Sequence, residues 1–228
     1  MPRFYYIFSA IVLADVLATT TEQTTLILIS RTLVSLSIIV FYILQKREFR
    51  LESWLIICAL LTTLLCDYIF LIVGNAFKYP LFIAISLKQL IGILLLWQDA
   101  NTKIPKIVNI ISQTLLYSIV CGLIYYLSVT PENYDTFFFG ANFILMGILF
   151  ALASFRKVDN RGFSFVFLGL FLLLFGAVFG IINYQWGFHS FAHIIDRVFN
   201  DFGIFFFNIG FIKSKPIHFV KEKTTLNL

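Results

Sequence analysis

Long apolar runs separated by short polar stretches make up most of this chain. Eight runs can be drawn, and most are close to the ~20 residues that cross the hydrocarbon core of a bilayer as an α-helix. Polar and apolar residues do not alternate along them, as they would in the strands of a membrane β-barrel. The pattern therefore predicts an all-α membrane protein with eight transmembrane helices. The predicted helices span Phe4–Ala18, Leu26–Leu44, Trp54–Val73, Tyr79–Trp97, Ile104–Val129, Tyr134–Phe155, Phe163–Tyr184 and Ser190–Ile212.

Composition supports the same class of protein. The chain has 228 residues, of which 60% are hydrophobic and 13% are charged, and its mean hydropathy is +0.91. Average soluble domains carry about 25% charged residues, so an ordinary water-soluble domain is excluded. No internal repeat and no polar block large enough for a second domain is visible. We expect a single eight-helix transmembrane domain over residues 1–213 and a short basic cytoplasmic tail over residues 214–228.

The distribution of Lys and Arg predicts the orientation. Lys78 alone falls on one side of the predicted bundle, whereas thirteen of the seventeen basic residues fall on the other. Basic residues collect in the cytoplasmic loops of membrane proteins, so both termini are predicted to be cytoplasmic, in the cell (inner) membrane. The net charge of +5 has the same explanation, and we expect no nucleic-acid partner. The thirteen are Arg3, Lys46, Arg47, Arg50, Lys103, Lys106, Arg156, Lys157, Arg161, Lys213, Lys215, Lys221 and Lys223.

Ionisable residues inside the predicted helices are the main candidates for function. A charged side chain at the centre of a membrane helix costs about 2.5–3.5 kcal/mol, so it usually points into the bundle toward a partner. Asp67 and Lys88 lie too deep for their charged groups to reach the lipid headgroups. Seven charged residues lie three or more positions from either end of a predicted helix. The first, second, third, fourth and eighth predicted helices hold all seven, which predicts a shared polar pocket among them. The other five are Asp15, Arg31, Asp196, Arg197 and Asp201.

Two interpretations of these charges remain open. In the first, they line a functional pocket. In the second, they are structural: Asp15, Arg31 and Asp196 lie near helix ends, where their charged groups can reach the lipid headgroups. A structural role for the deeper residues would take the form of an ion pair between Asp67 and Lys88.

The histidines provide a weak metal motif. His189 and His193 are four residues apart and so share one face of a helix, where two imidazoles could bind a metal with Asp196 or Asp15. A third His is missing on that side, because His218 lies on the cytoplasmic tail. An interfacial role for the pair is favoured, and we expect no metal.

Other short motifs indicate packing. Gly176 and Gly180 form a GxxxG pattern, which lets the backbones of two membrane helices approach closely. Cys58, Cys66 and Cys121 lie within apolar runs and lack the spacing of a disulfide framework or a metal site. We therefore expect no cofactor.

Stretches of the first half carry a family resemblance. Arg31-Thr32-Leu33 opens the second predicted helix, Cys66-Asp67 lies in the third, and Phe77-Lys78-Tyr79-Pro80 leads into the fourth, which contains Lys88. This order resembles the YhhN-like family of integral membrane proteins, which includes lysoplasmalogenases. In that family the corresponding residues are Lys-Pro-Leu, Gly-Asp, and a Phe and Gly pattern followed by His. Asp67 matches the family's Asp, whereas Lys88 replaces its His.

The second half resembles the family more weakly. The family has a Gly-rich seventh helix that ends in Ser-Asp, and an aromatic and Gln motif in the eighth. Here the seventh helix contains Gly169-Leu170-Phe171, with Gly176-Ala177 where Ser-Asp would fall. The eighth contains Phe199-Asn200-Asp201-Phe202-Gly203 and no Gln. The resemblance implies the eight-helix fold over the full length, while its most specific residue is Asp67.

The resemblance implies hydrolysis of a lysolipid vinyl ether with release of a fatty aldehyde. That chemistry needs an acid that protonates the vinyl ether and a base that directs water onto the resulting oxocarbenium ion. Asp67 would be the acid, and Lys88 would lie beside it. The base would come from Asp15, Asp196 or Asp201, because the family's second Asp is absent at Ala177. The alternative is a non-catalytic relative whose ion-pair pocket binds lipid or a membrane partner.

Overall fold

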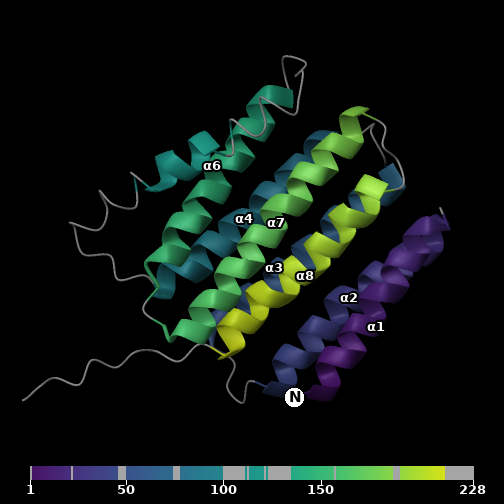
Figure 1. Ribbon diagram of the computed structural model, residues 1–228, viewed down its shortest axis with the longest axis horizontal. Coiled ribbons are helices and arrows are strands. Elements are labelled where there is room, and N and C mark those ends of the chain that lie inside the picture. Colours follow the sequence, from purple (N-terminus) through teal and green to yellow (C-terminus); the bar gives the residue numbers. More distant parts are fainter. Residues whose placement is uncertain are drawn as a thin grey trace, which may run out of the picture.

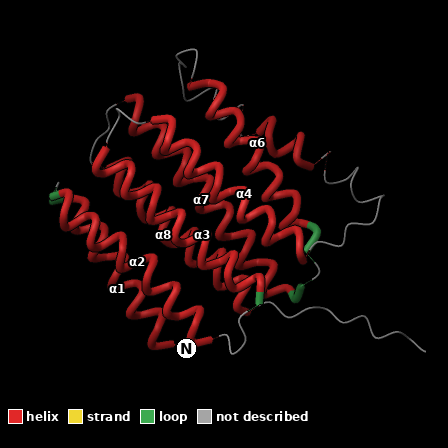
Figure 2. Tube along the Cα trace, turned by 180° about the vertical axis from the view of Figure 1, so that it is seen from behind, coloured by secondary structure: helices red, strands yellow, loops and turns green. Residues whose placement is uncertain are grey.

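A computed structural model of the chain consists of helices packed side by side with their axes roughly aligned (Figures 1 and 2). It describes residues 2–21, 23–45, 50–73, 78–99, 111, 113–120, 122, 135–156, 158–186 and 191–213. The helices are α1 (Pro2–Thr20), α2 (Thr24–Gln45), α3 (Leu51–Tyr68), α4 (Lys78–Asp99), α6 (Asp135–Ser154), α7 (Asn160–Trp186) and α8 (Phe191–Lys213). A π-helical segment, Ile69–Val73, continues α3.

The helix predictions are confirmed closely. Seven of the eight predicted helices begin and end within three residues of the observed boundaries, once the π-helical segment is counted with α3. Of the fifth, Ile104–Val129, the described residues 111, 113–120 and 122 are helical. Local hydropathy was sufficient for this result, because a lipid-covered backbone can satisfy its polar groups only within a helix or a closed barrel, and the apolar runs lack the alternation of barrel strands.

Among the described residues, four helices are long and apolar enough to cross a membrane. They contain the spans Thr24–Gln45, Leu51–Ile72, Pro80–Gln98 and Asn160–Gly180. Large apolar side chains such as Leu33, Trp54, Ile83 and Leu94 point outward from three of these spans and are about half exposed. A surface of that kind is suited to lipid, so the chain is a membrane protein. Eight spans and cytoplasmic termini stay predictions.

The helices close into a ring. Each described helix packs on its neighbour in the chain, α4 packs directly on α6, and α8 returns to α1 and α2. Figure 1 shows α1 and α2 at one edge, α6 near the other, and α7 and α8 passing in front of α3 and α4. The described helical residues 113–120 lie outside the ring, where the ring of Tyr117 packs against Phe150 of α6 in a tilted arrangement. The ring encloses the space in which the charged residues meet.

Glycines make a close seam between α7 and α8. A Cβ atom built at Gly169 would lie 2.7 Å from the Cα atom of Phe207, and one built at Gly203 would lie 2.9 Å from the backbone nitrogen of Leu173. Only a glycine permits backbones to approach so closely. The predicted GxxxG pair also faces α8, where Gly176 lies against the Asn200 side chain. The seam therefore determines how far the polar face of α8 reaches into the ring.

We expect Gly169→Ala to destabilise the protein by about 1–3 kcal/mol, because the added methyl group overpacks the seam. Gly140→Ala is the matched control, since a Cβ atom at Gly140 of α6 meets nothing within 4 Å and alanine favours a helix. Thermal unfolding in detergent measures the difference. Equal melting temperatures for the two variants would show that the seam tolerates a side chain.

Candidate functional site

Arg197 lies at the centre of a cluster of buried charges. Its guanidinium donates to three carboxylates: Nε to Asp15 at 3.4 Å, Nη1 to Asp67 at 3.0 Å and Nη2 to Asp201 at 3.1 Å. These acids come from α1, α3 and α8. Asp15 is fully buried and Asp201 is 1% exposed. A cation without these partners would be too costly to bury, so the three contacts explain why Arg197 can lie inside the bundle.

A second arginine and a serine complete this Arg/Asp cluster. Arg31 of α2, which is 2% exposed, donates from Nη1 to the same oxygen of Asp67 at 3.4 Å. The hydroxyl of Ser30 donates to Asp15. Asp67 therefore accepts from two guanidinium groups that come from different helices. Within the described residues, Nε and Nη2 of Arg31 and Oδ2 of Asp201 are buried without a hydrogen-bond partner.

The sequence places these groups through helical spacing. Arg197 and Asp201 are four residues apart on α8, so they share the face that packs on α1 and α2. Asp67 is near the end of α3, immediately before the π-helical segment Ile69–Val73. A π-helical turn changes which residues face inward, and such turns occur often at functional sites.

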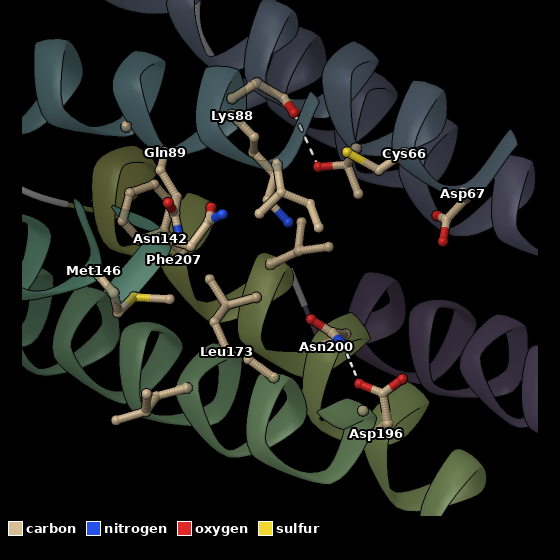
Figure 3. A pocket seen from close by; sticks show the side chains of 18 of the residues that line it. Cys66, Asp67, Lys88, Gln89, Asn142, Met146, Leu173, Asp196, Asn200 and Phe207 are labelled. Atoms are coloured by element: carbon tan, nitrogen blue, oxygen red, sulfur yellow. Dashed lines mark hydrogen bonds between the residues drawn. The ribbon is translucent and has the colours of Figure 1, made fainter. Parts of the chain in front are cut away.

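A cavity of about 530 Å³ lies inside the ring, next to the Arg/Asp cluster. Its wall comes from α2, α3, α4, α6, α7 and α8, and most of the exposed lining is apolar. Figure 3 shows Asp67 and Asp196 at one end, with Gln89, Asn142 and Met146 toward the other. The ionisable side chains of the wall are Arg31, Asp67, Lys88, His193, Asp196 and Arg197.

The cavity separates the four predicted acids into two groups. Asp67 and Asp196 line it, whereas Asp15 and Asp201 lie in the Arg/Asp cluster and are not part of its wall. Asp196 accepts a hydrogen bond from the amide of Asn200, one turn along α8. Within the described part of the chain, Asp196 makes no ion pair with Lys or Arg.

The expected pairing of Asp67 with Lys88 is wrong. Asp67 pairs with Arg31 and Arg197, and no ion pair joins it to Lys88. Lys88 instead points from α4 into the cavity (Figure 3). The physical reason is that two arginines, Arg31 of α2 and Arg197 of α8, approach the carboxylate of Asp67, while Lys88 lies in the cavity wall on α4. If the charged pocket has a structural role, its ion pairs are therefore those of Asp67 with Arg31 and Arg197, and not one with Lys88.

The predicted histidine pair is only partly within the described residues. His193 lines the cavity, whereas His189 lies outside the described residues. Among the residues that the structure describes, no group of three or more His, Cys, Asp and Glu side chains could hold a metal ion.

Uncharged polar residues of the site were missed in the sequence. Gln89, Asn142, Asn200 and Asn208 all line the cavity. These four residues could have been identified from the sequence, because an amide side chain within an apolar run also needs a hydrogen-bond partner inside the bundle. The central position of Arg197 was missed as well, since its three contacts depend on helices far apart in the chain.

Comparison of the chain with protein-family models, with curated proteins and with solved structures finds no match. The resemblance to the YhhN-like family therefore stays a prediction, based on the short stretches described above.

We expect Arg197→Met to destabilise the protein by about 3–5 kcal/mol, because three buried carboxylates would share the single remaining guanidinium of Arg31. Arg161→Met is the control, since Arg161 is exposed at the start of α7. Melting temperature and monodispersity in detergent measure the effect. The central role of Arg197 would be refuted by two variants that unfold at the same temperature.

Proposed function

We propose that this protein is a membrane hydrolase of the lysoplasmalogenase type, which cleaves the vinyl ether of a lysolipid bound in the cavity. The proposed setting is the cell membrane, with eight transmembrane helices and cytoplasmic termini. Membership of the YhhN-like family is part of the proposal. The observation that carries it is the presence of two carboxyl groups, from Asp67 and Asp196, in the wall of one largely apolar cavity.

The shape and lining of the cavity support a single-chain lipid. Its volume lies within the range of ~300–1,000 Å³ that is usual for small-molecule sites. Apolar side chains from α4, α6, α7 and α8 line it, including Ile85, Met146, Leu173 and Phe207. An alkenyl chain would contact these side chains, and its vinyl ether would lie near the acids.

The environments of the two carboxyl groups favour different roles. Asp67 accepts hydrogen bonds from two guanidinium groups, which hold it as a carboxylate. It is therefore suited to be the base that directs water onto the oxocarbenium ion. Asp196 has the amide of Asn200 as its hydrogen-bond donor and no ion pair among the described residues. It is therefore the better candidate for the acid that protonates the vinyl ether.

This assignment exchanges the expected roles. The sequence favoured Asp67 as the acid and left the second carboxyl among Asp15, Asp196 and Asp201. Asp15 and Asp201 do not line the cavity. They form ion pairs with Arg197 and neutralise its charge. We assign both to positioning, since they hold the guanidinium that contacts Asp67.

A non-catalytic lipid-binding protein is the second candidate. One observation favours it: the same two ion pairs that hold Asp67 could serve only to close the ring of helices. In that case the cavity would bind a lysolipid without releasing an aldehyde. Turnover of purified protein distinguishes the two functions.

We expect purified protein in detergent to release fatty aldehyde from a lysoplasmalogen, and Asp196→Asn to reduce the rate by at least about a hundredfold. Asp67→Asn should have a similar effect, with a loss of stability because two arginines lose their shared carboxylate. Asp159→Asn is the matched control, because Asp159 lies outside the cavity wall and accepts from the backbone of Gly162. Aldehyde release by Asp196→Asn at the wild-type rate would remove Asp196 from the mechanism, and a wild-type protein without turnover would leave lipid binding as the function.

A further inference from the structure

Lys88 has no charged partner in the described part of the chain. Its amine lies in the cavity wall on α4, yet no carboxylate of the described residues comes within 4.0 Å of it. An ammonium group inside a membrane helix is costly unless it is compensated. An anionic group bound in the cavity would supply that compensation by direct contact.

The neighbouring charges do not supply it. Arg197 is matched by Asp15 and Asp201, and Arg31 shares Asp67 with Arg197. Among the described residues, the other carboxyl in the wall belongs to Asp196, which accepts a hydrogen bond from Asn200. In Figure 3 Lys88 lies apart from both acids of the wall, on the side toward Gln89 and Asn142.

The residue beside Lys88 adds an unpartnered acceptor. Gln89 is 7% exposed, lines the same cavity, and its side-chain oxygen Oε1 is buried without a hydrogen-bond partner among the described residues. A buried amide oxygen in that state calls for a donor such as a hydroxyl group. An ammonium and an acceptor on consecutive residues are together complementary to an anionic group that carries a hydroxyl nearby.

We propose that Lys88 and Gln89 form the head-group site of the cavity, where Lys88 binds the phosphate and Gln89 the glycerol hydroxyl of a single-chain glycerophospholipid. This inference rests on the proposed function in one respect, namely that the cavity holds a lysolipid. Beyond the proposed function, the head-group site requires that binding of the lysolipid depends on its anionic phosphate. A single-chain lipid without a phosphate would leave the ammonium uncompensated.

The test compares two probes with the same saturated alkyl chain: 1-O-alkyl-glycerol 3-phosphate and 1-O-alkyl-glycerol. Both are ethers without the vinyl bond, so binding is measured in the absence of turnover. We expect wild-type protein in detergent to bind the phosphate probe about tenfold or more tightly than the neutral one. Equal affinities would overturn the proposal without the need for any variant.

Variants connect the preference to the two residues. Lys88→Met should bring the ratio of the two affinities close to one, Lys88→Arg should retain the preference, and Lys213→Met should leave it unchanged. Lys213 is the matched control because its ammonium lies over the rings of Tyr5 and Phe165, outside the cavity wall. Gln89→Leu should weaken binding of both probes by a similar factor, since both carry the hydroxyl. A preference that survives in Lys88→Met would refute the assignment.

Two further ligands separate the possible sources of the anion. Inorganic phosphate alone should bind far more weakly than the phosphate probe, and a fatty acid of the same chain length should bind less tightly because it lacks the glycerol hydroxyl. Tight binding of inorganic phosphate would refute a lipid ligand. The outcome is independent of catalysis: a protein without aldehyde release that still prefers the phosphate probe would contradict the hydrolase and support the head-group site.

Discussion

The structure depends on the neutralisation of Arg197 by three carboxylates. Burial of one guanidinium requires acids that come close from several directions, and the chain supplies them from α1, α3 and α8 itself. Any rotation or shift of one of these helices would separate at least one charged pair in a medium that cannot replace it. The apolar contacts of the ring are less selective, because lipid-covered and buried faces are similarly hydrophobic. Charge pairing therefore specifies which helices are neighbours.

The same cluster shapes the candidate site. Asp15 and Asp201 pair with Arg197 outside the cavity wall. Of the two carboxyl groups that line the cavity, Asp67 accepts hydrogen bonds from arginines and Asp196 accepts one from an amide. Two acids of identical chemistry thereby obtain different surroundings, which is the arrangement that acid and base catalysis needs. The seam of glycines contributes to this difference, since α8 must approach α7 closely for Asp196 and Asn200 to lie against Gly180 and Gly176.

Much of the fold could be predicted from the sequence, and less of the site. Helix positions follow from hydropathy over about twenty neighbouring residues, which is local information. The prediction that charges from the first to third and eighth helices meet was also sound, because each needs a partner in lipid. Lys88 of the fourth helix lines the cavity but makes no ion pair among the described residues. The choice of partner was wrong for Asp67, since it depends on helix rotation, on the π-helical segment after Asp67 and on the return of α8 to α2. None of these is encoded in the spacing of residues along one helix.

The ring is completed by its last helix, and this has a consequence for the biogenesis of the protein. Arg197 is separated from Asp15 by 182 positions. At a synthesis rate of ~5–20 residues per second, Asp15 enters the membrane roughly 10–40 seconds before its partner exists. During this interval Arg31 is already available to Asp67, whereas among the described residues Asp15 has the hydroxyl of Ser30 as its side-chain partner. A ribosome that stalls before α8 would leave an uncompensated carboxylate in the bilayer, which is a feature that membrane quality control can recognise.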